Sequence, residues 1–535
     1  MDRSSIYEDI NAKLAADDIE GAIDLAEVAI SLDQVQPLAL NLCAFRLERS
    51  GDFEGARKLL EQALQIDPND VTVLSAVGHL WLKQASPSNA MQAFAAALHR
   101  EPDYAPAHHG AGLALWGLGD PKMAREAQVK AAALEPSYPD PRGALALLAL
   151  QDKDKAGARA YALEALALDP AEPSAFLTLA TLDNEQGEHE AVAERVAHQL
   201  SAPNVAPMQR SLLFRLQGDA LDALRRFDEA FAAYSAGNAI QHRTFAAQHA
   251  GEEIETATAL CRRIAAAFEA DFHPIPPTRP TVGPDVNHVF LLGFPRSGTT
   301  LLEQILASHG NVVALEEQPT LSPPIREFFL DQETLAPLAA LTGGDLQTRV
   351  DAYWARVAGY GLDVAGKTFV DKQPSLTLYL PLIARMFPEA KIIVARRDPR
   401  DVVLSCFRRS FTMNRTIYEF TELESLSAYY SAVMELAEAF MASLPLTFHV
   451  HKHETMVADF DGEIAKLCAA IGLSFEAGMR DFVETAKRRD VRTPSALQVE
   501  QGLNASGIGH WRNYAAHLAP IIPRLKPWIA RFGYM

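Results

Sequence analysis

The fold of this 535-residue chain is decided by the stretch HVFLLGFPRSGTTLLEQILAS, residues 288–308. Its apolar run 289–292 predicts a buried β-strand, and the glycine-bounded segment 293–298 predicts a loop. Helix-forming residues return from Thr299 onward. Such a loop turns backbone N–H groups toward a helix N-terminus, where unpaired donors and the helix dipole favour an anion. The sequence therefore predicts an anion-binding strand–loop–helix unit.

The loop has the outline of a nucleotide-binding loop but lacks its lysine. Gly293 and Gly298 meet the spacing G-x-x-x-x-G-K-[ST], whereas Thr299 occupies the lysine position. Without lysine a triphosphate loses its principal point charge, and no acidic strand end suits Mg²⁺ convincingly. Arg296, inside the loop, supplies positive charge instead. A nucleoside triphosphate bound through magnesium is therefore disfavoured.

A second segment, KIIVARRDPRDVVLSCFRRS (391–410), predicts another strand, turn and helix. Asp398 suits the N-cap of that helix and Pro399 its first position. Arg397 stands at the end of the predicted strand, and Ser405 follows eight residues later, in the predicted helix. The segment is also compatible with an exposed basic helix start that binds nothing.

Together the two segments resemble sulfotransferases that use 3′-phosphoadenylyl sulfate (PAPS) and release adenosine 3′,5′-bisphosphate. The resemblance implies that the loop holds the 5′-phosphate and the transferring sulfuryl group. The implied loop residues are Pro295, Arg296, Ser297, Gly298, Thr299 and Thr300. It also implies that Arg397 and Ser405 contact the 3′-phosphate. A sulfuryl group carries less charge than a terminal phosphoryl group, so side-chain and backbone donors suffice and no metal is expected.

The segment after the loop helix, HGNVVALEEQPTLSPP (309–324), is similar to tyrosylprotein sulfotransferases, in which the second residue of a Glu-Glu pair is the general base. The resemblance assigns that role to Glu317, with Glu316 as the weaker candidate. A carboxylate suits the role because the acceptor hydroxyl must lose a proton as it attacks sulfur. The alternative is a solvated acidic pair on a turn.

A lysine lies between these motifs. Lys372, in FVDKQP, matches the Lys-x-Pro stretch of the same family. The resemblance implies that Lys372 and Arg296 stabilise charge on the sulfuryl group and the leaving phosphate.

The resemblance to sulfotransferases is weaker in the segment LNASGIGHWRNYAAHL (503–518). Asn504 and Ala505 replace the basic pair of the small-molecule enzymes, and backbone amides of Ser506 and Gly507, or the side chain of Arg512, are expected to substitute. A serine that assists the tyrosylprotein enzymes appears as Gly509, and an arginine near their base appears as Pro319. These differences leave the acceptor open.

The N-terminal half has a strict period of 34 residues. Prolines that follow Asp or Glu keep it at Pro68, Pro102, Pro136 and Pro170. Alanines keep it at Ala22, Ala56, Ala90, Ala124 and Ala158, and again at Ala29, Ala63, Ala97, Ala131 and Ala165. Glycines fall on multiples of it at Gly51, Gly119 and Gly187. Small residues let paired helices approach, glycine serves the turn, and proline ends the second helix.

This pattern resembles tetratricopeptide repeats, roughly six units over residues 1–245. Such an array is either a rigid arm or a surface that binds a protein or peptide segment. A bridging helix (252–272) and a five-proline linker follow within 246–286. The expected fold is thus an α solenoid joined to a three-layer, P-loop-like α/β domain at 287–535 with a mostly parallel sheet.

Composition limits the expected partners and the expected compartment of the protein. The net charge of −19 disfavours nucleic acid as a partner, and 48% hydrophobic residues favour a globular protein. Four scattered cysteines favour a reducing compartment. No apolar run reaches the ~18 residues of a spanning helix, so a cytoplasmic protein without membrane contact is expected.

Three alternating histidines, His449, His451 and His453, suit either zinc or an ordinary strand. The strand is favoured, because sulfuryl transfer gives a metal no task. The preferred acceptor is a protein or peptide hydroxyl or phenol, tyrosine included. The alternatives are a small molecule or glycan acceptor, or a repeat scaffold that binds nucleotide without catalysis. The oligomeric state stays open.

Overall fold

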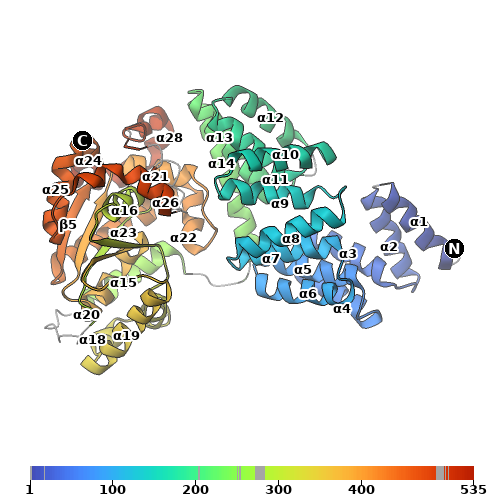
Figure 1. The fold of residues 1–535 in the computed structure, drawn as a ribbon, viewed down its shortest axis with the longest axis horizontal. Coiled ribbons are helices and arrows are strands. Elements are labelled where there is room, and N and C mark those ends of the chain that lie inside the picture. The colour runs from blue at the N-terminus through green and yellow to red at the C-terminus, as the bar shows by residue number, and fades with distance from the viewer. Residues whose placement is uncertain are drawn as a thin grey trace. The chain divides into compact units, whose positions relative to one another are not determined.

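The computed structural model describes residues 3–16, 18–202, 205–249, 251, 255–271, 283–489, 499, 502–503 and 505–535. The chain divides into two compact units, Met1–Val192 and Ala193–Met535. In Figure 1 the N-terminal helices run from blue to green and the α/β domain from yellow-green to red. Among the described residues, every helix falls short of the length or apolarity that crossing a bilayer requires.

The N-terminal region is a series of helix pairs. Its helices are α1 (Arg3–Ala15), α2 (Ile19–Ser31), α3 (Pro37–Ser50), α4 (Phe53–Ile66), α5 (Val71–Lys83), α6 (Pro87–Arg100), α7 (Ala105–Gly117), α8 (Pro121–Leu134), α9 (Asp140–Gln151), α10 (Lys155–Leu168), α11 (Pro173–Glu185) and α12 (His189–Ser201). The predicted repeat geometry is confirmed. Each periodic proline stands two residues after a helix end, as Pro68 does after α4.

The small periodic residues have the predicted roles. All ten periodic alanines are at most 1% exposed, so each sits where two helices touch. Gly51, Gly119 and Gly187 adopt φ values of 88°, 84° and 92°, a left-handed turn conformation that side chains resist. Helix contact and turn geometry together explain the 34-residue period.

Two more helices, α13 (Pro207–Ala223) and α14 (Phe227–Gln248), form a further pair. The described residues between 3 and 248 therefore form seven consecutive pairs, where the sequence predicted about six. The periodic proline does not recur after Pro170, and Gly187, between α11 and α12, is the last of the periodic residues named above. The pair α13–α14 lies in the second compact unit. The domain limits 1–245, 246–286 and 287–535 stay predictions.

The predicted bridging helix corresponds to α15 (Ala257–Asp271). Residues 252–254 and 272 of the predicted helix lie outside the described residues. The same holds for four of the five linker prolines, Pro274, Pro276, Pro277 and Pro280.

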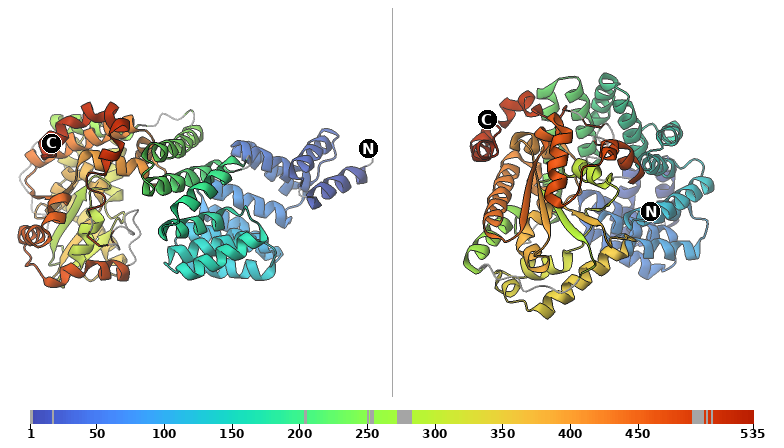
Figure 2. Two further views of the ribbon diagram at one scale, coloured as in Figure 1. Left: turned by 90° about the horizontal axis from the view of Figure 1, so that it is seen from above. Right: turned by 60° about the vertical axis from the view of Figure 1, so that its left-hand side comes forward.

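A five-stranded sheet forms the centre of the second unit (Figure 2). Its strands are β1 (Asn287–Gly293), β2 (Val312–Glu316), β3 (Thr368–Lys372), β4 (Lys391–Arg396) and β5 (Thr447–Lys452). The order is β2-β3-β1-β4-β5, and all four pairings are parallel. The carboxyl ends of all strands therefore meet at one edge, where open parallel sheets bind ligands.

The sheet is covered by helices on both faces. The α-helices are α16 (Thr299–Ala307), α17 (Ser322–Ile325), α18 (Ala336–Ala339), α19 (Gly343–Gly359), α20 (Leu380–Met386), α21 (Pro399–Arg408), α22 (Arg415–Tyr418), α23 (Leu423–Ser443), α24 (His453–Ala458), α25 (Phe460–Ile471), α26 (Phe482–Arg489), α28 (Ala515–Leu518) and α29 (Ile522–Phe532). Short turns are η1 (Arg326–Leu330), η2 (Pro374–Tyr379), η3 (Glu419–Thr421), η4 (Ala477–Asp481), η5 (His510–Tyr514) and η6 (Ala519–Ile521).

Strand β1 shows how the layers arise. Its Val289 and Leu291 pack in a core with apolar residues of α16, α25 and α26. The alternate residue Phe290 turns to the opposite face, where its ring lies 5.7 Å from Phe387 and 6.5 Å from Tyr353 of α19. Because strand side chains alternate, one strand supplies both cores. The predicted three-layer α/β domain is confirmed.

Candidate functional site

The loop after β1 passes very close to its neighbour strand. A Cβ atom on Gly293 would lie 2.8 Å from the carbonyl oxygen of Ala395, so only glycine fits beside β4. Gly298, with φ +95°, is the N-cap of α16. Arg296 also has a left-handed backbone, with φ +70°. Strained conformations of this kind concentrate at ligand sites, and the predicted strand–loop–helix unit is present.

Arg296 is buried in the loop, with 7% of its surface exposed. Its Nε donates to Ser405 Oγ at 3.0 Å, which links the loop to α21. Burial, together with the positive charges of Arg409, Arg397 and Arg408, lowers the pKa of Arg296 to about 9. The guanidinium is therefore charged at neutral pH and is repelled by its neighbours. An anion would relieve this repulsion.

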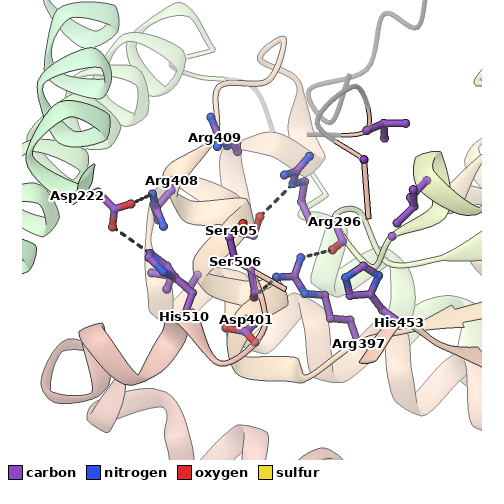
Figure 3. Close-up of a pocket in the computed structure, with 16 residues that line it drawn as sticks. Asp222, Arg296, Arg397, Asp401, Ser405, Arg408, Arg409, His453, Ser506 and His510 are labelled. Carbon is purple, nitrogen blue, oxygen red and sulfur yellow. Dashed lines mark hydrogen bonds and ion pairs between the residues drawn. The ribbon is translucent and has the colours of Figure 1, made fainter. Parts of the chain in front are cut away.

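A cavity of about 290 Å³ opens beside the loop (Figure 3). It is lined by four arginines together with serine, histidine, aspartate, glycine and apolar residues. They are Arg296, Arg397, Arg408, Arg409, Ser405, Ser506, His453, His510, Asp222, Asp401, Gly298, Gly502, Gly507, Leu301, Leu404 and Val499. Four arginines against two carboxylates give the wall a positive excess, and the volume approaches that of small-molecule pockets.

Arg397 joins three parts of this wall. Its Nη1 donates to the carbonyl oxygen of Arg296 at 3.3 Å, and its Nη2 donates to the carbonyl oxygen of Gly507. The predicted N-cap is also present, because Asp398 accepts a hydrogen bond from the backbone N–H of Arg400 at 2.9 Å. Arg397 thus stands at the carboxyl end of β4, held by hydrogen bonds to the loop after β1 and to Gly507.

The backbone around Gly509 and Trp511 is hydrogen-bonded to the start of α21. Asp401 accepts from the backbone N–H groups of Gly509 at 2.6 Å and Trp511 at 2.8 Å. The guanidinium of Arg400 lies 3.9 Å from the Trp511 ring centroid. Ser506 and Gly507, just before this segment, line the cavity wall.

Arg512 is placed differently. It is exposed, lies 5.2 Å from the Trp511 ring and is not among the residues that line the cavity. Asn504, which was compared with the missing basic pair, lies outside the described residues. The proposed substitution of the basic pair by Arg512 gains no support from this position.

A second cluster lies at the ends of β2 and β3. Lys372 is fully buried, and its Nζ lies 2.8 Å from Glu317 Oε1, 3.3 Å from Glu303 Oε2 and 3.5 Å from Glu316 Oε1. Arg489 Nη1 in turn lies 3.1 Å from Glu303 Oε1. The sequence placed Lys372 and Glu317 in one site, and the structure brings them into direct contact. Neither residue lines the cavity described above.

Opposite charges within this cluster affect the pKa values of Glu303 and Lys372. Burial raises the pKa of Glu303, although Lys372 and Arg489 oppose that rise. Burial alone would lower the pKa of Lys372, but the three glutamates outweigh it and the pKa is raised. Lys372 is therefore a charged ammonium in the interior, held by carboxylates on three sides.

Glu317 is the more exposed of the two adjacent glutamates. Its side chain is 42% exposed, whereas that of Glu316 is 20% exposed. Its backbone N–H donates to the carbonyl oxygen of Lys372 at 2.8 Å, and its φ is +45°. The chain therefore leaves β2 in a strained turn directly after the last ladder bond. The carboxylate reaches both solvent and the buried lysine.

The remaining predicted residues of the loop lie next to Arg296 and Gly298, which line the cavity. Ser297, Thr299 and Thr300 are each 4% exposed, and the carbonyl oxygen of Pro295 accepts from Cys406 Sγ at 3.4 Å. They belong to the loop and the first turn of α16, but they are not among the lining residues.

The histidine pattern resolves into a strand and a helix start. His449 and His451 lie on β5 with ring centroids 6.3 Å apart, and His453 begins α24 and lines the cavity beside Gly298. Burial and the nearby Arg397 lower the pKa of His453 to about 3, so its imidazole is neutral. Across the part of the chain that the structure describes, no three His, Cys, Asp or Glu side chains are grouped to hold a metal ion.

Sequence reasoning missed several of these residues. Glu303 was read only as part of the loop helix, and nothing in its surroundings marks a buried carboxylate. Asp222 lies in the helical half and gave no signal. Arg408 and Arg409 belong to the segment 391–410, whose sequence is also compatible with an exposed basic helix start that binds nothing.

Comparison with known proteins agrees with this geometry. Residues 288–477 match the sulfotransferase family, and residues 47–115 and 105–138 match tetratricopeptide repeats. The chain therefore combines tetratricopeptide repeats with a sulfotransferase-family domain, as the sequence predicted.

Three curated proteins show the range of relatives. An uncharacterized protein of Aquifex aeolicus is 29% identical over 252 residues, which cover 45% of this chain and 33% of that protein. A "Putative protein-tyrosine sulfotransferase" of Caenorhabditis briggsae is 21% identical over 256 residues, 46% of this chain and 88% of that protein. The nodulation protein NoeE of Sinorhizobium fredii is 35% identical over 126 residues, 22% of this chain and 30% of that protein.

Several solved structures also match part of the chain. The type IV pilus biogenesis factor PilW is 20% identical, with a TM-score of 0.31, over 38% of this chain and 92% of that chain. PilF of Pseudomonas aeruginosa is 20% identical, with a TM-score of 0.30, over 40% of this chain and 93% of that chain.

Proposed function

We propose that the chain is a PAPS-dependent sulfotransferase that moves a sulfuryl group to a hydroxyl or phenol. The observation that carries the proposal is the cavity lined by Arg296, Arg397, Arg408 and Arg409 at the carboxyl edge of the sheet. Bound PAPS would supply the sulfuryl group, and adenosine 3′,5′-bisphosphate would be the product.

The residues at the cavity fit such a donor. The charged Arg296 and the N-terminus of α16 suit the 5′-phosphosulfate end, because backbone donors and a guanidinium converge there. Arg397 and Ser405 suit the 3′-phosphate, and the backbone of Ser506 and Gly507 completes the same wall. A wall with excess positive charge favours a ligand with several anionic groups.

The second cluster supplies the proton chemistry. Glu317 accepts the proton of the acceptor hydroxyl, and its exposure lets an acceptor approach. Lys372 lies 2.8 Å from Glu317 Oε1 and supplies positive charge as the acceptor oxygen attacks. Arg296 and the loop amides stabilise the charge that develops on the leaving phosphate.

The favoured acceptor is a protein or peptide, tyrosine included. Two features support this choice: the similarity to the Caenorhabditis briggsae protein and the tetratricopeptide repeats, which commonly bind protein segments. Incubation with radiolabelled PAPS and a panel of peptides, phenols and glycans tests it. Label on tyrosine peptides is expected. Label confined to glycans or small phenols would refute the peptide acceptor, and tight nucleotide binding without transfer would favour a scaffold.

Arg397→Ala is expected to weaken binding of adenosine 3′,5′-bisphosphate by about 10- to 100-fold, because a charge-assisted contact is lost. Binding of adenosine 5′-monophosphate, which lacks the 3′-phosphate, should change much less. Isothermal titration calorimetry with both ligands measures the difference.

Arg512→Ala is the matched control, since it removes an arginine that lies outside the cavity wall. Its affinity for both nucleotides should equal that of the wild type. Equal loss of both nucleotides in Arg397→Ala, or a larger loss in Arg512→Ala, would contradict the assignment of the 3′-phosphate site.

A further inference from the structure

One residue of the cavity wall comes from the helical pair α13–α14. Asp222 lies near the end of α13, whereas the other lining residues fall between 296 and 510. Figure 3 shows Asp222 at the side of the cavity, directed toward Arg408 and His510. A helix pair that resembles the end of a repeat array thus contributes a side chain to the anion site.

Asp222 binds groups from two other elements. Its Oδ2 lies 2.7 Å from Arg408 Nη2 on α21. Its Oδ1 accepts from His510 Nε2 at 2.9 Å and from the hydroxyl of Tyr514, both on η5. Burial would raise the pKa of Asp222, but His510, Arg408 and Tyr514 outweigh it and lower the pKa to about 2. The carboxylate is therefore ionised and fully engaged.

Arg408 is fixed by the same pair of helices. Its guanidinium lies 5.2 Å from the ring centroid of Tyr234 on α14 and 5.6 Å from that of Tyr514. Its side chain is only 13% exposed, so the paired carboxylate of Asp222 offsets the cost of burying the guanidinium. Asp219, one helical turn before Asp222, adds a second carboxylate 3.6 Å from Arg409. The two aspartates thus reduce the repulsion among the cavity arginines.

The helix pair is itself held firmly against the α/β domain. The ring of Phe231 stacks between Phe407, at 5.4 Å, and His517, at 4.1 Å. Asn238 Nδ2 donates to the carbonyl oxygen of Phe407 at 3.0 Å. Phe407 immediately precedes Arg408, so the packing of α14 also fixes the backbone that carries the arginine.

We propose that Asp222 is a positioning residue of the donor site. Together with α13–α14 it holds Arg408 and His510 in the cavity wall before the donor arrives. Preorganised groups bind more tightly, because less ordering has to occur on binding. The helix pair is therefore a working part of the donor site and more than a spacer before the catalytic domain. The inference rests on the proposed function, since the ligand is the sulfuryl donor.

Asp222→Asn tests the proposal. The variant keeps the size of the side chain and removes the charge that pairs with Arg408. Affinity for adenosine 3′,5′-bisphosphate, measured by calorimetry, should fall about 10-fold or more. Asp222→Glu, which restores the charge, should recover most of that loss, to within about threefold of the wild type. If the side chain had only a structural role, the affinity for the nucleotide would not depend on its charge in this way.

Asp228→Asn is the matched control. Asp228 lies on the same helix pair and contacts His517 Nε2 at 2.8 Å, but it is 91% exposed and does not line the cavity. Its affinity for the nucleotide should equal that of the wild type. Unchanged or tighter binding in Asp222→Asn, or an equal loss in Asp228→Asn, would overturn the proposal.

A second variant covers the case in which Asp222→Asn does not fold. Arg408→Lys keeps the charge but lacks the planar guanidinium that lies near the rings of Tyr234 and Tyr514, and a several-fold loss of affinity is expected. Wild-type affinity in this folded variant would refute the role of Arg408. If the wild type binds no adenosine 3′,5′-bisphosphate, the proposed function fails. If the wild type binds and Asp222→Asn binds equally well, only the positioning role fails.

Discussion

Glu317→Gln is expected to lower turnover by about 10² to 10⁴, the usual contribution of a positioned general base, while donor affinity stays nearly unchanged. The amide keeps the size of the side chain but cannot take the acceptor proton. Glu317 qualifies because it combines 42% exposure with direct contact to the buried Lys372. Transfer of radiolabelled sulfate to the acceptor found in the panel gives the turnover, and calorimetry gives the affinity.

Glu316→Gln is the control for this prediction. Glu316 also contacts the lysine, at 3.5 Å, but it is less exposed, so its replacement should reduce turnover only a few-fold. Full activity in Glu317→Gln, or a larger loss in Glu316→Gln than in Glu317→Gln, would show that the base is assigned to the wrong glutamate.

Lys372→Met is expected to reduce both stability and turnover. The methionine would leave Glu303, which is fully buried, without its lysine and with only the ion pair to Arg489 out of the two described above. Breaking a buried ion pair from one side costs about 3–5 kcal/mol. Hydrogen exchange should therefore become faster in peptides that cover β3 and α16, and turnover should fall because the charge next to the reacting group is gone.

A second substitution separates the two effects. In Lys372→Met combined with Glu303→Gln, the buried carboxylate that lost its lysine is removed, so protection of β3 and α16 should largely return while turnover stays low. Recovery of turnover in the double variant would mean that Lys372 acts only in folding. Wild-type protection in the single variant would contradict the charge balance of the cluster.

Local sequence patterns predicted the elements whose conformation is set by their own residues. The 34-residue period of small residues reports helix contact directly, because any side chain larger than alanine would separate the helices. Gly293 and Gly298 mark backbone that only glycine adopts easily. Asp398 marks a helix start through an interaction that spans two residues.

Long-range ion pairs could not be predicted in the same way. The contact between Asp222 and Arg408 joins residues 186 positions apart, in halves of the chain that carry unrelated patterns. Glu303 needs both Lys372 and Arg489 to be acceptable in the interior, and neither lies near it in sequence. The family resemblance located Lys372 and Glu317, but it did not indicate that two further glutamates share the lysine.

The residues of the cavity favour one nucleotide over another. Thr299 replaces the lysine that a triphosphate requires, whereas Arg397 and Ser405 line the cavity where a 3′-phosphate would lie. The cavity should therefore select adenosine 3′,5′-bisphosphate over ATP with magnesium.

Isothermal titration calorimetry of the full chain with each of these two ligands tests this claim most directly. We predict that adenosine 3′,5′-bisphosphate binds at one site per chain without added metal and at least about tenfold more tightly than ATP with magnesium, a difference of about 1.4 kcal/mol. Equal or tighter binding of ATP with magnesium, or no binding of adenosine 3′,5′-bisphosphate, would contradict the assignment of this cavity as a sulfuryl-donor site.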